Sequence, residues 1–170
     1  MGNGVKPVDV VDRTEEWQTV AARVVAGHGV ASGRNGNPKF PGGTLRMQAD
    51  HFRKQGVDLF MFHIGTVNVS IAPYAYQVLS SRHTVRQVKW HPTDPAEDFS
   101  FFDVRVLAPD CATVHGLIYY PHPDTKPTHF QHPDVLELLL PFVKSLSYGA
   151  EIQLAVRRDQ LRITPSLDSQ

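Results

Sequence analysis

The stretch SFFDVRVLAPDCATVHGLIYYP, residues 100–121, decides the fold class of this chain. Its two arms, 100–108 and 113–121, are filled with β-branched and aromatic residues, which favour extended strands. Between the arms, APDCAT has the residue types of a tight turn and predicts a hairpin. Because 85–90 and 150–156 have the same strand character, the sequence predicts a mainly β fold.

Long loops and a short helix interrupt these strands. The segment GRNGNPKFPGGT, residues 33–44, is too rich in Gly, Asn and Pro for a regular element and predicts a long shaped loop. A second long loop, rich in Pro and His, is expected over 122–133. A short helix is expected over 48–56, closed by its final glycine.

Three further segments complete the expected order of elements. Residues 14–33 begin with a capping signature and continue with alternating apolar residues, which predicts a short helical start followed by a strand. Residues 58–73 carry apolar runs on either side of Gly65 and predict strand, bend and strand. The segment 133–149 predicts a helix that Pro141 breaks or kinks.

The length of 170 residues suits one domain. We expect a single domain over 14–158, with a flexible N-terminus at 1–13 and a C-terminal tail at 159–170. Short strands with one or two short helices and two long loops predict a compact, closed or nearly closed β-barrel of about six strands, whose closure leaves few free edges.

Composition excludes several classes of function. The chain has 17 Lys and Arg against 17 Asp and Glu, so it has no basic footprint for nucleic acid. Cys111 is the single cysteine, which excludes an intramolecular disulfide and a cysteine zinc site. No apolar run is long enough to span a bilayer. We therefore expect a soluble, cytoplasmic protein whose partner is a small molecule, with no nucleic acid or membrane partner.

Two glycine-marked segments are candidates for binding phosphate and metal. VASGRNGN, residues 30–37, follows an expected strand and can present backbone N–H groups to a phosphate or a base, the alternative being an ordinary Asn-Gly turn. In GTVNV, residues 65–69, Thr66 and Asn68 are two positions apart and point to the same side of a strand. Their oxygens suit Mg²⁺ beside phosphates, the alternative being the solvent face of an edge strand.

Histidines and one acidic residue give two further candidates. Clustered imidazoles can hold a transition metal, although no HxH or HExxH pattern is present and loop packing is the alternative. The histidines in question are His63, His115, His122, His129 and His132. Glu137 is the single acid in the apolar run VLELLLPF. It is either an exposed position of the expected helix or a hydrogen-bond acceptor or general base in a site.

Taken in order, these segments resemble the archaeal CTP-dependent riboflavin kinase family. The resemblance extends over residues 25–156, where a strand leading into VASGRNG is followed by GTVNV, FFDVRV, GLIYYP, ELLLP and a closing strand. It implies a compact cradle-loop β-barrel that transfers the terminal phosphoryl group of CTP to the 5′-hydroxyl of riboflavin, giving FMN and CDP. Mg²⁺ is the implied cofactor.

The resemblance also implies roles for individual residues. Thr66 and Asn68 would hold Mg²⁺. Glu137 would lie by the flavin, where it is the candidate catalytic group that accepts or orients the proton of the attacking hydroxyl. The glycine-bearing loop and the residues after Pro141 would contact the nucleotide. These nucleotide-binding candidates are Ala31, Ser32, Gly33, Arg34, Phe142, Val143 and Lys144.

The chain departs from the family on the acceptor side. PGGTLRMQADHF, residues 41–52, has no counterpart there, and the Pro- and His-rich loop is longer. Thr125 and Thr128 both lie near the position of the family's flavin-contacting threonine, while His129 occupies it. Two alternatives therefore stay open, a non-catalytic ligand-binding barrel and a histidine-metal enzyme of the same fold. The sequence does not decide the oligomeric state.

Overall fold

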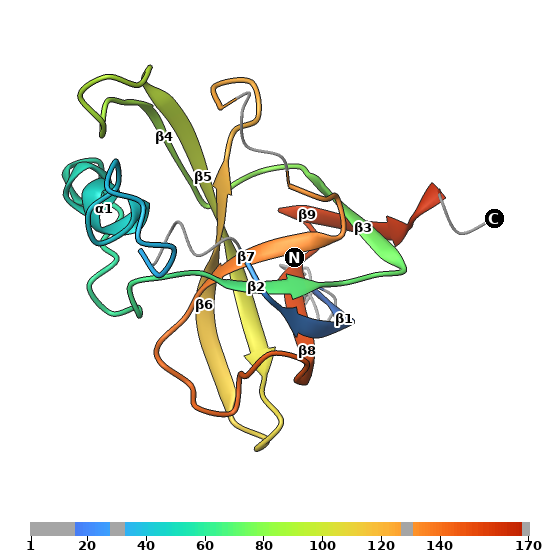
Figure 1. Ribbon diagram of the computed structural model, residues 1–170. Helices are drawn as coiled ribbons and strands as arrows, with labels where there is room; N and C mark the ends of the chain where they lie inside the picture. Colours follow the sequence, from blue (N-terminus) through green and yellow to red (C-terminus); the bar gives the residue numbers. More distant parts are fainter. Residues whose placement is uncertain (1–15, 28–32, 127–130, 168–170) are drawn as a thin grey trace, which may run out of the picture.

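The computed structural model describes residues 16–27, 33–126 and 131–167, which form nine strands and one helix (Figure 1). The elements in chain order are β1 (Trp17–Val25), α1 (Thr44–Lys54), β2 (Val67–Ser70), β3 (Tyr74–Val78), β4 (His83–Val88), β5 (Glu97–Leu107), β6 (Thr113–Pro121), β7 (Val135–Leu139), β8 (Glu151–Arg157) and β9 (Leu161–Pro165). In the described part of the chain, α1 is too short and too polar to cross a membrane.

Seven strands form one antiparallel sheet in the order β4-β5-β6-β7-β2-β1-β8. β5 also pairs with β8, in a register that runs from Val104 opposite Val156 to Leu107 opposite Gln153. The strands β5, β6, β7, β2, β1 and β8 are therefore connected in a continuous ring of pairings, with β4 attached outside it. β3 and β9 form a separate two-stranded sheet. The prediction of a mainly β fold is confirmed, with more strands than expected.

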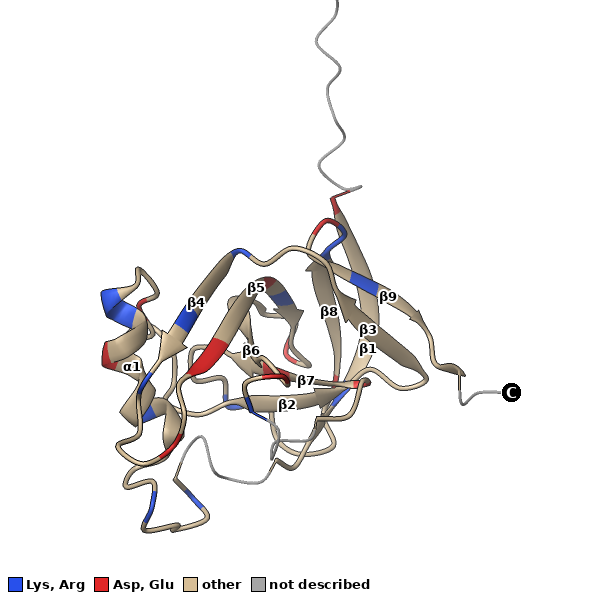
Figure 2. Cartoon of the chain, turned by 90° about the horizontal axis from the view of Figure 1, so that it is seen from above, with Lys and Arg blue, Asp and Glu red and all other residues tan. Residues whose placement is uncertain are grey.

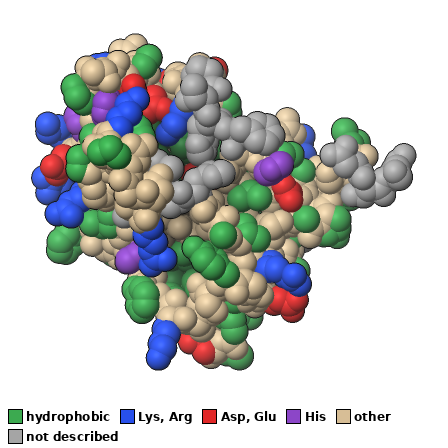
Figure 3. Space-filling model, viewed as in Figure 1, with side chains coloured by type: hydrophobic (Ala, Val, Ile, Leu, Met, Phe, Trp, Pro, Cys, Tyr) green, Lys and Arg blue, Asp and Glu red, His purple; other side chains and the backbone are tan. Residues whose placement is uncertain are grey.

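The outlying elements lie at opposite sides of the molecule. Seen from above, α1 lies beyond β4 at one side, and the β3 and β9 pair lies at the other (Figure 2). On the face shown in Figure 3, basic and acidic side chains are interspersed with exposed hydrophobic ones. This mixture fits the equal numbers of basic and acidic residues in the chain.

The core consists of two apolar clusters on either side of β5. Successive strand residues point to opposite faces, so Phe101 and Phe102 enter different clusters. Phe102 belongs to an inner cluster formed by the ring of strands. Phe101 belongs to a helix cluster, where the ring of Phe52 from α1 packs edge-on at 5.3 Å between centroids. The first half of β5 is thus buried on both faces, whereas its second half alternates between buried Val104 and Val106 and exposed Arg105 and Leu107.

The hairpin and the first helix follow the sequence closely. β6 has the predicted bounds, and β5 begins three positions before the predicted residue 100. In the turn between them, Cys111 has a φ of 64°. α1 confirms the helix predicted over 48–56 but begins at Thr44. The predicted helical start within 14–33 is wrong in its described part, since Glu16 forms a turn and β1 follows directly.

The predicted helix over 133–149 is also wrong, because its first half is strand β7. β7 pairs with both β2 and β6 and buries Leu136 and Leu138 in the inner cluster. An apolar run this short fits a buried strand as well as a buried helix, and periodicity does not separate them. Pro141 lies just beyond the strand, where its missing N–H no longer matters for the ladder. Glu137 therefore projects from a strand.

The segment 58–73 contains one strand, β2, where the sequence predicts two. Residues 58–66 form no regular element, and the Asp58 side chain accepts the backbone N–H of Phe60 at 2.9 Å. Such an aspartate turn competes with extended pairing. Phe60 is 93% exposed, whereas Leu59 and Phe62 are partly buried against the helix cluster, so the first apolar run packs at the edge of the core without forming a strand.

The stretch expected to be a C-terminal tail contains β9. Its first residue, Leu161, is fully buried in the inner cluster. Just before it, the Gln160 side chain accepts the backbone N–H of Asp103 at 2.7 Å and donates to the Asp103 carboxylate at 2.8 Å. The end of the chain is therefore joined to β5.

A chain that ends at Arg158 is expected to lose at least ~3 kcal/mol of unfolding free energy, because a fully buried leucine and a two-stranded sheet are removed. A chain that ends at Ser166 keeps β9 and serves as the control. Urea denaturation of both against the full chain checks this. Equal midpoints for all three would show that β9 adds no stability.

Candidate functional site

Asn68 and Glu137 face each other on neighbouring strands. They are directly opposite residues in the antiparallel pair of β2 and β7. Their sequence neighbours Val69, Leu136 and Leu138 are buried in the inner cluster. Since side chains alternate along a strand, Asn68 and Glu137 share the opposite face. Two residues singled out from distant motifs are therefore brought together.

Thr66 and the end of β1 border the same place. Thr66 lies two residues before Asn68 and is partly buried. Val25, the last residue of β1, pairs with Asn68. A Cβ placed on Gly27 would lie 2.2 Å from Asn68 Nδ2, so the amide of Asn68 fills the space that this glycine leaves open. The residue that follows β1 by two positions therefore lies directly beside Asn68.

The nucleotide-binding candidates of this segment are described in part. Ala31 and Ser32 lie outside the described residues. Gly33 has a φ of 79°, and a Cβ there would lie 2.7 Å from the backbone of Gly42 and Gly43. A side chain at Gly33 is thus excluded both by conformation and by the close approach of the loop's far end. Arg34 follows it at an exposed position.

The other nucleotide-binding candidates follow β7. The His63 N–H donates to the Leu140 carbonyl at 2.9 Å, and the rings of His63 and Phe142 lie 5.9 Å apart. These contacts join the segment before Thr66 to the segment after β7. Phe142 is 75% exposed, Val143 is partly buried and accepts a hydrogen bond from the Leu146 N–H, and Lys144 is exposed. Phe142 thus lies beside the segment that leads into Thr66.

A pocket of about 310 Å³ opens where β6 and β7 diverge. The two strands pair from Leu117 opposite Leu139 to Tyr119 opposite Glu137 and then separate. Tyrosine rings and prolines form most of the walls, and three polar side chains reach in. The aromatic and polar lining residues are Tyr76, Tyr119, Tyr120, Lys126, Gln131 and Glu137. An apolar pocket with few polar groups is typical of a small-molecule site.

The electrostatics of the pocket centre on Glu137. Burial raises the pKa of its carboxyl to about 7, and the Lys126 ammonium opposes that rise. Burial also raises the pKa of Tyr119, whose hydroxyl donates to Gln48 Oε1 at 2.9 Å. Glu137 therefore changes charge near neutral pH, which favours proton exchange with a substrate.

Glu137 is expected to make the protein less stable as pH rises. The ordinary pKa of a glutamate carboxyl, 4.5, applies to Glu137 in the unfolded chain, and its pKa in the folded chain is about 7. The folded state binds more protons in that window, so the unfolding free energy falls as pH increases. Glu137→Gln should remove up to about 3 kcal/mol of this dependence.

Urea denaturation between about pH 5 and pH 8 checks this expectation. The difference between the wild type and Glu137→Gln should grow with pH. The exposed Glu151→Gln on β8 is the matched control and should show a constant difference. Parallel curves for the wild type and Glu137→Gln would contradict the raised pKa.

The histidines do not form a metal centre in the described part of the chain, where no group of three His, Cys, Asp or Glu residues is arranged to hold a metal. His122 Nε2 is hydrogen-bonded to the Ser100 hydroxyl at 2.6 Å. His115 lies opposite Arg105, and His63 contacts Phe142. His132 is exposed, and His129 lies outside the described residues.

Mg²⁺ requires a different kind of site. It takes oxygen ligands, keeps several waters and is bound through a few protein groups together with substrate phosphates. Thr66 and Asn68 supply a hydroxyl and an amide oxygen, and the carboxyl of Glu137 lies opposite Asn68. This donor set fits Mg²⁺ in the presence of a nucleotide.

Six residues of the site are not predicted from the sequence. Tyr119 and Tyr120 lie in GLIYYP, and Lys126 and Gln131 lie in the Pro- and His-rich loop, but nothing in those segments signals a pocket. Gly27 carries a signal, because it follows a strand and precedes a second glycine. The residues concerned are Gly27, Tyr76, Tyr119, Tyr120, Lys126 and Gln131. Comparisons with protein-family models, with characterised proteins and with solved structures find no match to this chain.

Proposed function

We propose that this protein is a cytoplasmic CTP-dependent small-molecule kinase that phosphorylates riboflavin or a related acceptor. The supporting observation is the position of Asn68, which lies opposite Glu137 and against Gly27. The resemblance assigns Asn68 to the metal and Glu137 to the acceptor, and it assigns residues 31–34, which follow Gly27 in the sequence, to the nucleotide. The ring of strand pairings supports a closed cradle-loop barrel as the scaffold.

Phosphoryl transfer requires mainly positioning and neutralisation of charge. Thr66 and Asn68 would hold Mg²⁺, which when bound neutralises charge on the phosphates. The acceptor's hydroxyl oxygen forms a bond to the terminal phosphorus, the bond to the leaving phosphate oxygen breaks, and CDP departs. Glu137, in its ionised form, receives the proton of the hydroxyl.

The nucleotide would lie between two segments that flank Asn68. On one side is the glycine-marked loop with Ala31, Ser32, Gly33 and Arg34, whose backbone N–H groups suit phosphate oxygens. On the other side are Phe142, Val143 and Lys144. The contact of Phe142 with His63 supports this arrangement because it places the second segment near Thr66.

The acceptor would occupy the tyrosine-lined pocket. Tyr76 and Tyr120 offer aromatic surface to a planar ring. Glu137 belongs both to the wall of this pocket and to the pair with Asn68. A ring in the pocket can thus direct a hydroxylated chain towards Asn68.

The purified chain should convert riboflavin and CTP into FMN and CDP in the presence of Mg²⁺, as measured by chromatography. ATP and GTP in parallel reactions define the donor, and omission of Mg²⁺ should stop the reaction. Absence of FMN with every donor, from protein shown to be folded, would reject the kinase function. Binding of riboflavin without turnover would indicate the alternative, a non-catalytic ligand-binding barrel.

A further inference from the structure

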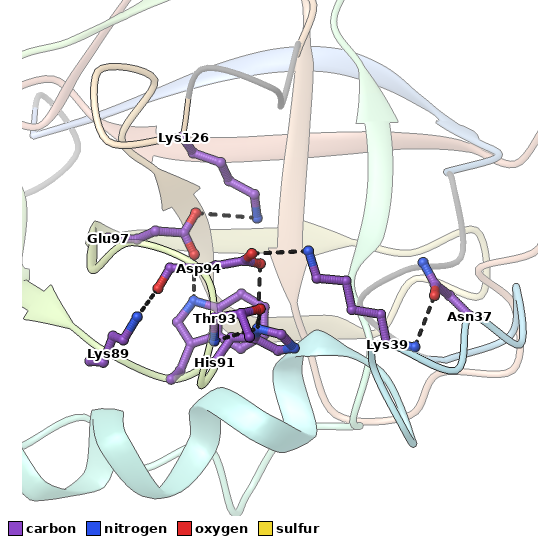
Figure 4. A network of polar contacts seen from close by, with 9 residues as sticks. Asn37, Lys39, Lys89, His91, Thr93, Asp94, Glu97 and Lys126 are labelled. Carbon is purple, nitrogen blue, oxygen red and sulfur yellow. Dashed lines mark hydrogen bonds and ion pairs between the residues drawn. The ribbon is translucent and has the colours of Figure 1, made fainter.

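Lys126 is a partly buried cation at the wall of the pocket. Its Nζ lies 3.7 Å from Glu97 Oε1 and 6.0 Å from the centroid of the Trp90 ring. Glu97 is 5% exposed, and its other carboxylate oxygen accepts a hydrogen bond from Trp90 Nε1. Figure 4 shows the Lys126 side chain extending towards Glu97. The ammonium is thus held in one place by a carboxylate that is itself fixed.

Lys126 has donor capacity left for a ligand. An ammonium group carries three N–H donors, and the carboxylate of Glu97 occupies one side of it. Its side chain is 22% exposed and lines the pocket together with Gln131. The buried Gln131 Nε2 finds no hydrogen-bond partner among the described residues. An unpaired buried donor is costly, which favours a ligand that supplies an acceptor.

The polar groups of the pocket therefore favour a ligand that supplies hydrogen-bond acceptors. Lys126 and Gln131 are donors without a full set of acceptors. Glu137 pairs with Asn68 across β7 and β2. Glu97 compensates the charge of Lys126, so the ligand does not have to be an anion. Acceptor atoms on a neutral ring meet these requirements, and aromatic walls select a flat ring.

We propose that Lys126 is a specificity-determining residue, which together with Gln131 selects a planar heteroaromatic ligand with carbonyl acceptors along one edge. The ring lies beside Tyr76 and Tyr120 with this edge towards Lys126. The inference rests on the proposed function only in taking the pocket as the acceptor site.

Two flat three-ring compounds separate this proposal from simple hydrophobic binding. Lumichrome has a pyrimidinedione edge, and phenazine has none. Calorimetric titration without CTP or Mg²⁺ should show lumichrome binding about 10-fold more tightly than phenazine, since hydrogen bonds to a charged donor contribute at this scale. The measurement requires no turnover.

Substitutions then assign the preference to Lys126. Lys126→Met should weaken lumichrome binding about 10-fold and leave phenazine binding unchanged, whereas Lys126→Arg should keep most of the affinity. Lys89→Met is the matched control. Lys89 lies between β4 and β5, where its ammonium donates to the Asp94 carbonyl, and it does not line the pocket. Gln131→Leu should weaken lumichrome binding about 5-fold and provides the test if Lys126→Met does not fold.

Unchanged lumichrome affinity in folded Lys126→Met, or in folded Gln131→Leu, would overturn the proposal. Equal affinity of the wild type for both compounds, or no binding of lumichrome, would also overturn it. If the protein binds lumichrome through Lys126 but makes no FMN, the proposed kinase function is rejected and the role of Lys126 stands. If it makes FMN but shows none of these binding preferences, the role of Lys126 is rejected and the kinase function stands.

Discussion

Replacing Asn68 by alanine is expected to lower the rate of FMN formation from CTP and riboflavin at least ~100-fold, since it removes the amide that we propose holds Mg²⁺. Asn68 lies opposite Glu137 and next to Gly27, so no neighbouring side chain replaces its amide. The measurement is the steady-state rate at saturating CTP and riboflavin, with circular dichroism to show that the variant is folded.

Two further variants test whether the loss of rate comes from the position of the Asn68 amide. Gln153→Ala removes an amide from an exposed position of β8 and should leave the rate unchanged. Gly27→Ala leaves Asn68 in place but introduces a Cβ 2.2 Å from its Nδ2, so the amide must move. It should therefore also lower the rate, by about 10-fold or more. Full activity in Asn68→Ala would remove this residue from the site.

Gly116→Ala is expected to destabilise the fold by at least ~3 kcal/mol. Gly116 lies in β6 opposite Val104 of β5. A Cβ there would lie 2.3 Å from the carbonyl oxygen of Leu139 and 2.5 Å from Leu140 Cδ2. The first of these atoms is backbone, so β6 and β7 would have to move apart, and their separation would expose the inner cluster.

Urea denaturation checks this expectation through the midpoint and slope of the transition. Thr113→Ala, at the exposed end of the same strand, is the control and should change stability by no more than about 0.5 kcal/mol. A midpoint for Gly116→Ala equal to that of the wild type would show that the close approach of β7 to β6 is not required. Since β7 carries Glu137, loss of this packing should also lower activity.

The candidate site illustrates how far sequence reasoning extends. The spacing of Thr66 and Asn68 is local, and alternation along a strand predicts both on one face, but β2 begins only at Val67, so this argument holds for Asn68 and not for Thr66. The opposition of Asn68 and Glu137 depends on the pairing of β2 with β7, which are separated by four other strands in the chain. No local pattern specifies such a partner, because register between distant strands is set by burial of complete faces.

The sequence alone determined the strands and loops whose residue types have strong local preferences. The β-branched and aromatic arms of β5 and β6 favour a hairpin through local preferences, and the glycines and prolines of 33–43 exclude regular structure. Only the tertiary structure decided that 135–139 is a strand and that β9 closes on β3, because both choices depend on partners. The same holds for the pocket. Its tyrosines, Lys126 and Gln131 come together because β6 and β7 diverge, and that divergence is a property of the packed sheet.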